Sequence, residues 1–181
     1  MGDAMKLKTI KIISVIGIFI LSFGAHFVYD LFPNVISSIF FPVNESIWEH
    51  MKILFTSIIL YGIIDYILLK KNNIRFNNFK SQLFFTTFIS IPIYLIIYLP
   101  LYNLFGENLF ISISLMFIVY IIIAYLSYKM LISDDFSLLN MISVYLIIVM
   151  YFIFTYLTYF PIHNYIFYDT NDEKYGIDEY E

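Results

Sequence analysis

The chain has 181 residues, of which 61% are hydrophobic and 13% charged, and its mean hydropathy is +0.82. A soluble domain of this size, in which about 25% of residues are charged, could not bury so much apolar surface, so the composition predicts a membrane protein. The chain has no cysteine, which excludes disulfides and thiolate metal sites, and its net charge of −4, without a basic cluster, argues against nucleic-acid binding.

The first apolar run follows a basic start and extends from about residue 10 to residue 32. This run is longer than the core of about 7–15 residues found in signal peptides, so we interpret it as a retained spanning helix. The next segment, residues 33–45, is apolar and contains Pro33 and Pro42. It is expected to lie in the membrane interface or to re-enter the membrane.

Further apolar runs have the length of about 20 residues that a spanning helix requires. They cover residues 46–69, 83–105, 109–131 and 141–160. Because lipid forbids unpaired strand edges, the fold class is predicted to be an all-α transmembrane bundle of five spans, residues 1–160. The third span contains Pro92 and Pro100 and is expected to be kinked. Residues 161–181 form an acidic tail, and its first half is expected to pack on the bundle.

The orientation follows from the short loops, since lysine and arginine favour the cytoplasmic side. These residues occur before the first span, between the second and third spans, and at the end of the fourth: Lys6, Lys8, Lys11, Lys70, Lys71, Arg75, Lys80 and Lys129. The alternation predicts a cell-membrane protein with a cytoplasmic N-terminus and an outer C-terminus.

All three histidines of the chain, His26, His50 and His163, are predicted to lie at the outer ends of spans. Carboxylates share that layer: Asp30 is four residues after His26, and Glu45 and Glu49 flank the start of the second span. Ionisable groups in spanning helices are costly and usually face the bundle interior. Imidazoles with carboxylates suit zinc, so the pattern predicts a metal site with the three histidines as ligands.

Each of these residues also has a simpler interpretation. Ser46 and Glu49 fit a capping box at the start of the second span, and Trp48 fits an interfacial aromatic belt. Lys52 is expected to snorkel or to pair with Glu49, and Asp65 to pair with loop lysines. These interpretations do not explain why every histidine is placed at one membrane depth.

Two stretches, His26 to Asp30 and Phe41 to His50 (FPVNESIWEH), resemble a family of small bacterial membrane proteins of unknown function. The region from Pro161 to Ile177 is similar to the end of that family. Ser46 and His50 also match the Ser-x3-His element of the ceramidase and progestin-receptor superfamily of zinc hydrolases. That weaker resemblance implies a zinc enzyme, although five spans replace seven and a late His-x3-His pair is missing.

The first hypothesis is a zinc-dependent membrane hydrolase that acts on a lipid or another outer-leaflet substrate. Its metal ligands would be His26, His50 and His163. Asp30, Glu45 or Glu49 would orient the ligands or carry protons, and Ser46 would position the substrate. The alternatives are a substrate-binding or transport subunit of a membrane complex and a structural polar cluster. Membrane lipids are the expected partners, and the sequence leaves protein partners and homo-oligomers open.

Overall fold

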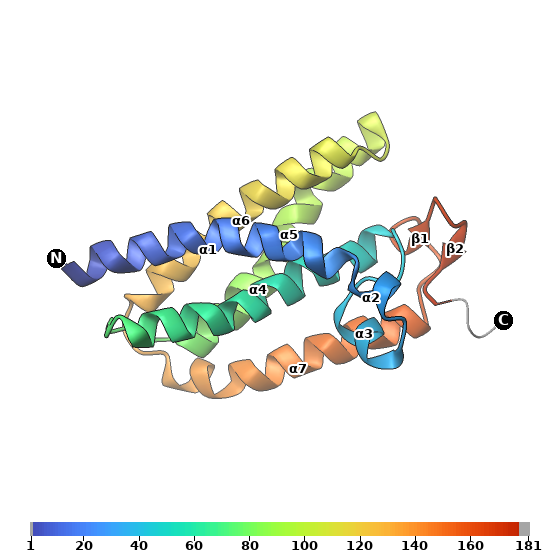
Figure 1. The fold of residues 1–181 in the computed structure, drawn as a ribbon. Coiled ribbons are helices and arrows are strands. Elements are labelled where there is room, and N and C mark those ends of the chain that lie inside the picture. Colours follow the sequence, from blue (N-terminus) through green and yellow to red (C-terminus); the bar gives the residue numbers. More distant parts are fainter. Residues whose placement is uncertain (1, 178–181) are drawn as a thin grey trace.

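The structure, a computed structural model, describes residues 2–177 and is a bundle of long helices with a small hairpin at one end (Figure 1). The long helices are α1 (Gly2–His26), α4 (Ile47–Lys71), α5 (Phe79–Phe105), α6 (Leu109–Leu131) and α7 (Ser137–Tyr159). The short elements are α2 (Val28–Leu31), α3 (Val35–Phe40), β1 (Tyr168–Asp169) and β2 (Lys174–Tyr175). The last four residues of the predicted acidic tail, 178–181, lie outside the described residues.

Five helices are long and apolar enough to cross a membrane, which confirms the predicted all-α bundle. The boundaries of the fourth span match the prediction, whereas α5 and α7 begin four residues earlier than expected. The first turns of both helices contain polar residues, such as Gln82 and Asn140, which the predicted apolar runs did not include. The predicted first span is divided: α1 ends at His26, and α2 follows after Phe27.

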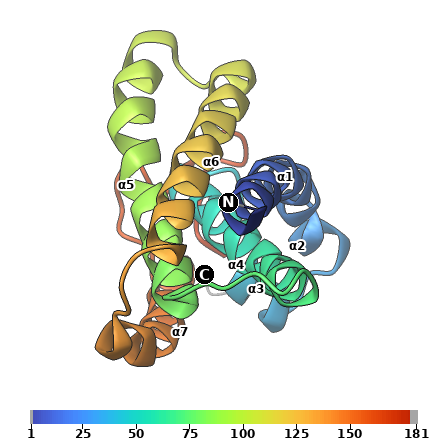
Figure 2. The same ribbon diagram turned by 90° about the vertical axis from the view of Figure 1, so that its left-hand side faces the viewer.

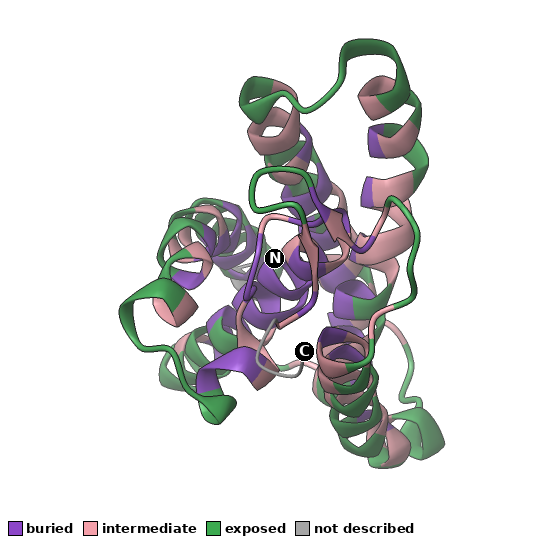
Figure 3. Ribbon diagram, turned by 90° about the vertical axis from the view of Figure 1, so that its right-hand side faces the viewer, coloured by how far each residue is buried: buried purple, intermediate pink, exposed green. Residues whose placement is uncertain are grey.

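The α4 helix lies at the centre of the bundle. In its most apolar window 61% of residues are buried, against 11–28% in the other four spans. Its neighbours are α1 and α5, while α6 packs on α1 and α5, and α7 packs on α5. Buried residues lie where the helices meet and exposed ones on the outer faces (Figure 3), which carry large apolar side chains such as Ile96 and Phe152. This is the distribution expected of helices that face lipid.

A close contact between α1 and α4 brings their ends together. At Gly17 on α1, a side-chain Cβ would overlap the ring of Tyr61 on α4. Small residues let helix backbones approach closely inside membranes. The contact therefore holds the last turn of α1, with His26, beside the first turns of α4, with His50.

Two ends of the bundle can be defined from this arrangement. The histidine end contains the last turn of α1, the first turn of α4, helices α2 and α3 and the β1–β2 hairpin, at the right of Figure 1. The lysine end is opposite and contains the start of α1 and the end of α6. There Lys11 pairs with Asp65 at 2.6 Å, so Asp65 pairs with a lysine of α1 and not with the loop lysines that we expected.

The segment between α1 and α4 forms the compact helix α3. Asn34 caps it by accepting hydrogen bonds from the backbone N–H groups of Ile36 and Ser37, and the Ser37 side chain completes a capping box. The Ser38 and Tyr159 hydroxyls lie 3.0 Å apart and link α3 to α7. This segment leads the chain back to the start of α4.

Candidate metal centre

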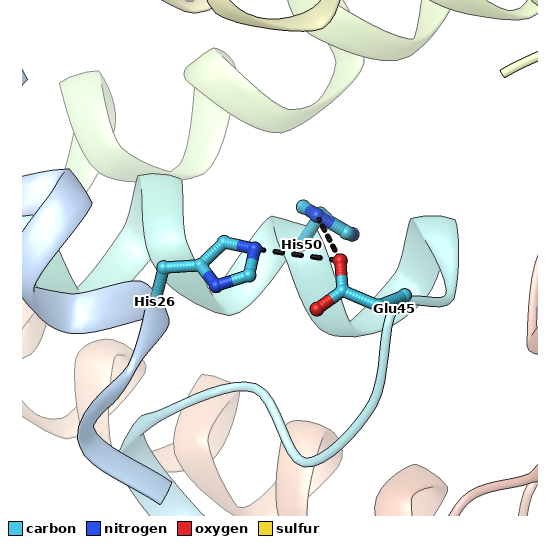
Figure 4. Close-up of side chains that lie close together, drawn as sticks. All are labelled: His26, Glu45 and His50. Atoms are coloured by element: carbon cyan, nitrogen blue, oxygen red, sulfur yellow. Dashed lines mark ion pairs between the residues drawn. The ribbon is translucent and has the colours of Figure 1, made fainter. Parts of the chain in front are cut away.

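Three side chains from two helices and a loop meet at the histidine end. His26 is the last residue of α1, His50 lies in the first turn of α4, and Glu45 lies in the loop just before α4 (Figure 4). The Nε2 atoms of His26 and His50 each lie 3.4 Å from the same oxygen, Oε2 of Glu45. One ligand atom of each residue lies within 4.8 Å of the others. We call these three residues the His–Glu group.

The ring of His50 is oriented by its own helix. Its Nδ1 lies 2.9 Å from the carbonyl oxygen of Ser46, which can only accept a hydrogen bond. Nδ1 therefore carries a hydrogen, and the other nitrogen, Nε2, is directed at Glu45. A backbone carbonyl that fixes the tautomer in this way is the usual support of a metal-binding histidine.

The backbone of Glu45 is held by the segment after α7. Its N–H donates to Oδ2 of Asp169 at 2.8 Å, while Oδ1 of Asp169 accepts hydrogen bonds from the N–H groups of Asn171 and Asp172. Asp169 is buried, so its carboxylate joins the turn of the hairpin to the loop before α4. This contact fixes the loop residue that completes the His–Glu group.

Further hydrogen bonds attach the same segment to the start of α4. The Asn44 side chain donates to the carbonyl of Gly176 at 3.0 Å, and the backbone N–H of Trp48 donates to the carbonyl of Ile166 at 2.9 Å. The Trp48 ring stacks on Phe167 and also contacts Phe154 of α7. Residues 161–177 thus lie against the histidine end, where Trp48 packs on aromatic rings of α7 and of this segment.

The carboxyl group of Glu45 lies between the two imidazoles. The neighbouring side chains of His26 and then of His50 lower the pKa of Glu45 well below its ordinary value, because positively charged or hydrogen-bonding partners favour the ionised carboxylate. Glu45 is therefore an anion across the physiological pH range, as a metal ligand must be.

Glu49 has a different environment from the catalytic one that the sequence suggested. It is buried, and its Oε2 accepts hydrogen bonds from Lys52 at 2.8 Å and from the Val43 N–H at 3.0 Å. Its Oε1 accepts one from the Thr158 hydroxyl at 2.6 Å. The expected pairing of Lys52 with Glu49 is confirmed, and the pair is a structural link between α4, α7 and the loop before α4.

The remaining predicted site residues lie outside the His–Glu group. His163 is exposed and stacks on Tyr175, with ring centroids 4.5 Å apart, and it does not belong to the group that could hold a metal ion, which includes Glu45. Asp30 is exposed on α2. The Ser46 hydroxyl caps α4 by accepting from the Glu49 N–H at 3.3 Å, whereas the Glu49 carboxylate does not complete the predicted capping box.

Two cavities meet at the His–Glu group. The first, which we call the tyrosine cavity, has a volume of about 70 Å³. The second, the apolar groove, has a volume of about 310 Å³ and runs between α1 and α6. Its rim carries the exposed side chains of Phe23, Phe27 and Leu109. Both cavities are lined by His26, Glu45, His50, Leu109 and Ser112.

The lining of the tyrosine cavity contains residues that our sequence reasoning did not identify. Tyr94, Tyr98 and Tyr102 follow one face of α5 at intervals of four residues, and Glu107 reaches the cavity from the turn before α6. The regular spacing of the tyrosines is a signal in the sequence, because residues i and i+4 share a helix face. It could not show that this face is directed at the His–Glu group.

The comparisons with known proteins identify the family of the chain and no activity. The model of a family of unknown function, DUF6512, matches residues 3–177, and the chain belongs to that family. None of the curated proteins matches it, and none of the solved structures does.

Proposed function

We propose that this chain, which belongs to the DUF6512 family of unknown function, is a metal-dependent membrane hydrolase with His26, Glu45 and His50 as its metal ligands. The observation that carries the proposal is the convergence of two Nε2 atoms on one oxygen of Glu45, each at 3.4 Å. A charge-assisted hydrogen bond between such groups is shorter, about 2.7–2.9 Å.

The distance from each Nε2 atom to Oε2 of Glu45 fits neighbouring ligands of one ion. Zinc bonds of about 2.0–2.1 Å in a tetrahedral site place neighbouring ligand atoms roughly 3.3 Å apart. Two histidines and one glutamate are also a ligand set of catalytic zinc sites, in which the fourth position holds water. Zinc would supply a bound water whose pKa lies near about 7.

The Nδ1 of His26 lacks the carbonyl support that the Nδ1 of His50 has. It is one of four buried side-chain nitrogen or oxygen atoms without a hydrogen-bond partner among the described residues. No described group therefore holds a hydrogen on this Nδ1, whereas the carbonyl of Ser46 does so for His50. As a metal ligand, His26 would present Nε2 to the ion and carry its hydrogen on Nδ1.

The proposed substrate is a membrane amphiphile, such as a lipid with an ester or amide bond near its head. The apolar groove between α1 and α6 would take the apolar chain, and the tyrosine cavity would take the polar head. The bond between head and chain would then lie beside the His–Glu group. Water would add to the carbonyl carbon of that bond, and Glu107, a carboxylate in the cavity lining, would carry the proton to the leaving group.

The positive charges at the lysine end support an outer location for this site. Short loops rich in lysine and arginine stay in the cytoplasm, so the histidine end would face the outside. The substrate would accordingly come from the outer leaflet.

A second function, a substrate-binding or transport subunit, is favoured by the ion pair of Lys11 and Asp65. This pair is buried, and the Ser14 hydroxyl also donates to Asp65 at 2.6 Å. Ionisable groups inside spans often mark the path of an ion. Stable co-purification of other chains, together with a wild-type protein that holds no metal, would favour this function over hydrolysis.

The test is elemental analysis of the detergent-purified protein and of four variants. We expect one zinc per chain in the wild type, and its loss in His26→Ala, Glu45→Gln and His50→Ala. The control is His163→Ala, which removes the histidine outside the group and should keep the metal. A wild-type protein that stays metal-free after incubation with zinc would overturn the proposal, as would equal metal loss in all four variants.

The hydrolase part is tested separately with a membrane lipid extract. Wild-type protein loaded with zinc should release new head-group or acyl products that mass spectrometry detects, and the Glu45→Gln variant should not. Stoichiometric zinc without any product would leave a metal site but contradict hydrolysis of these lipids.

A further inference from the structure

A second groove between α1 and α6 lies at the lysine end, far along both helices from the His–Glu group. It has a volume of about 500 Å³, within the range of about 300–1,000 Å³ that is usual for ligand sites. We call it the lysine groove. Its lining residues are Lys8, Lys11, Ile12, Val15, Ile121, Ala124, Tyr125, Tyr128, Lys129 and Ile132.

The walls of the lysine groove are two continuous helix faces. On α6 the lining residues form two rows with a spacing of four, one through Tyr125 to Lys129 and the other through Ala124 and Tyr128. Residues at this spacing lie above one another on a helix. Each helix also places a lysine in the lining near this end of the bundle, Lys129 on α6 and Lys8 on α1.

Among the side chains that the structure describes, those of residues 4–177, no carboxylate forms an ion pair with the two lysines at the mouth of the groove. Within that range, the ion pairs that involve a lysine join Lys11 to Asp65, Lys52 to Glu49 and Lys174 to Asp172. Lys8 and Lys129 are exposed. Their ammonium groups lie 5.7 and 5.5 Å from the ring centroids of Tyr128 and Tyr125, so the rings hold two unpaired positive charges over the groove.

We propose that the lysine groove binds one anionic phospholipid, with an acyl chain between α1 and α6 and the phosphate at Lys8 and Lys129. The apolar walls require an apolar ligand, and the two unpaired ammonium groups require a negative charge at one end of it. Basic pockets between spanning helices are known to take anionic head groups. A zwitterionic lipid would bring its own cation toward the lysines, and a soluble anion would leave the apolar walls uncovered.

This site is independent of the proposed hydrolase, because its lining shares no residue with the His–Glu group. The exposed apolar residues Ile12, Ile121 and Ile132 in its walls would be covered by the acyl chain. The lipid would fasten α1 to α6 at the end where α1 begins.

The experiment is native mass spectrometry of the full chain in neutral detergent with added phosphatidylglycerol or phosphatidylcholine. We expect the wild type to retain one phosphatidylglycerol, with a preference of about tenfold or more over phosphatidylcholine. The variant Lys8→Gln/Lys129→Gln should lose this preference. The matched control, Lys70→Gln/Lys71→Gln, removes two exposed positive charges from the same end, outside the groove, and should retain it.

A steric variant separates the groove from general attraction to the charged end. Ile12→Trp fills the groove from an exposed position while every lysine stays, and it should abolish retention of phosphatidylglycerol. Unchanged thermal unfolding in lipid-free detergent shows that each variant is folded. Equal loss in both double-lysine variants, or full retention by Ile12→Trp, would overturn the proposal, and neither result would bear on the metal content of the His–Glu group.

Discussion

His50 donates its Nδ1 hydrogen to the carbonyl oxygen of Ser46, 2.9 Å away, and thereby directs Nε2 at Glu45. This nitrogen binds a metal only when it carries no proton. We therefore predict that zinc affinity falls as the pH is lowered through the range of about 5 to 8 in which imidazoles change charge. Isothermal titration of zinc into the metal-free protein at several pH values checks this, and a pH-independent affinity would contradict histidine ligation.

The carboxyl of Glu45 gives the metal-free protein a pH dependence of stability. The imidazoles of His26 and then His50 lower its pKa below the ordinary 4.5, so the unfolded chain binds this proton more readily than the folded one. The contribution of Glu45 is thus fully present above that ordinary value and is lost as the pH falls through the lower folded value.

We predict that Glu45→Gln destabilises the metal-free protein more at about pH 6 than at about pH 3, by less than about 1 kcal/mol because the group is partly exposed. Thermal unfolding with a chelator present measures the difference. The same loss at both pH values would mean that the charge of Glu45 does not matter.

Asp169 is expected to act on the site through the backbone of Glu45. The two carboxylate oxygens of Asp169 together accept hydrogen bonds from three backbone N–H groups. Asp169→Asn replaces one of these oxygens with an NH2 group, which can only donate. We predict a fall of about 10–100-fold in zinc affinity, the range found when a support of a ligand is removed. Asp172→Asn, in the same turn but exposed, is the control, and equal affinities in the two variants would argue against this role.

The buried pair of Glu49 and Lys52 is predicted to govern stability. Glu49→Gln or Lys52→Met leaves one partner charged and buried, which costs about 3–5 kcal/mol. The double variant should lose less than the sum of the single ones, because it leaves neither charge. Asp172→Asn breaks the exposed pair with Lys174 and should cost at most about 1 kcal/mol. Chemical unfolding in detergent provides the comparison.

The close contact at Gly17 is predicted to set the distance between the two histidines. Gly17→Ala would push α1 away from Tyr61 and cost about 1–3 kcal/mol, and zinc affinity would fall with it. Gly24→Ala has open space around the new methyl group and should leave affinity unchanged. If Gly17→Ala binds zinc like the wild type, the contact does not position His26.

The sequence by itself determined the class of fold. Apolar runs of spanning length permit only helices in lipid, and the described structure contains five helices that meet this requirement. Antiparallel succession of spans then places His26, at the end of α1, and His50, at the start of α4, at the same end of the bundle. Both inferences hold because they depend on length and order along the chain.

The direction of individual side chains was decided by the tertiary structure. We grouped His26 with Asp30, and Glu45 with Glu49, by their spacing of four residues, which fixes a common face only inside one helix. The helix breaks at Phe27, which separates Asp30 from His26, and Glu45 precedes the cap of α4. Glu45 reaches the histidines because Asp169, more than a hundred residues later, holds its backbone, and no local pattern encodes that contact.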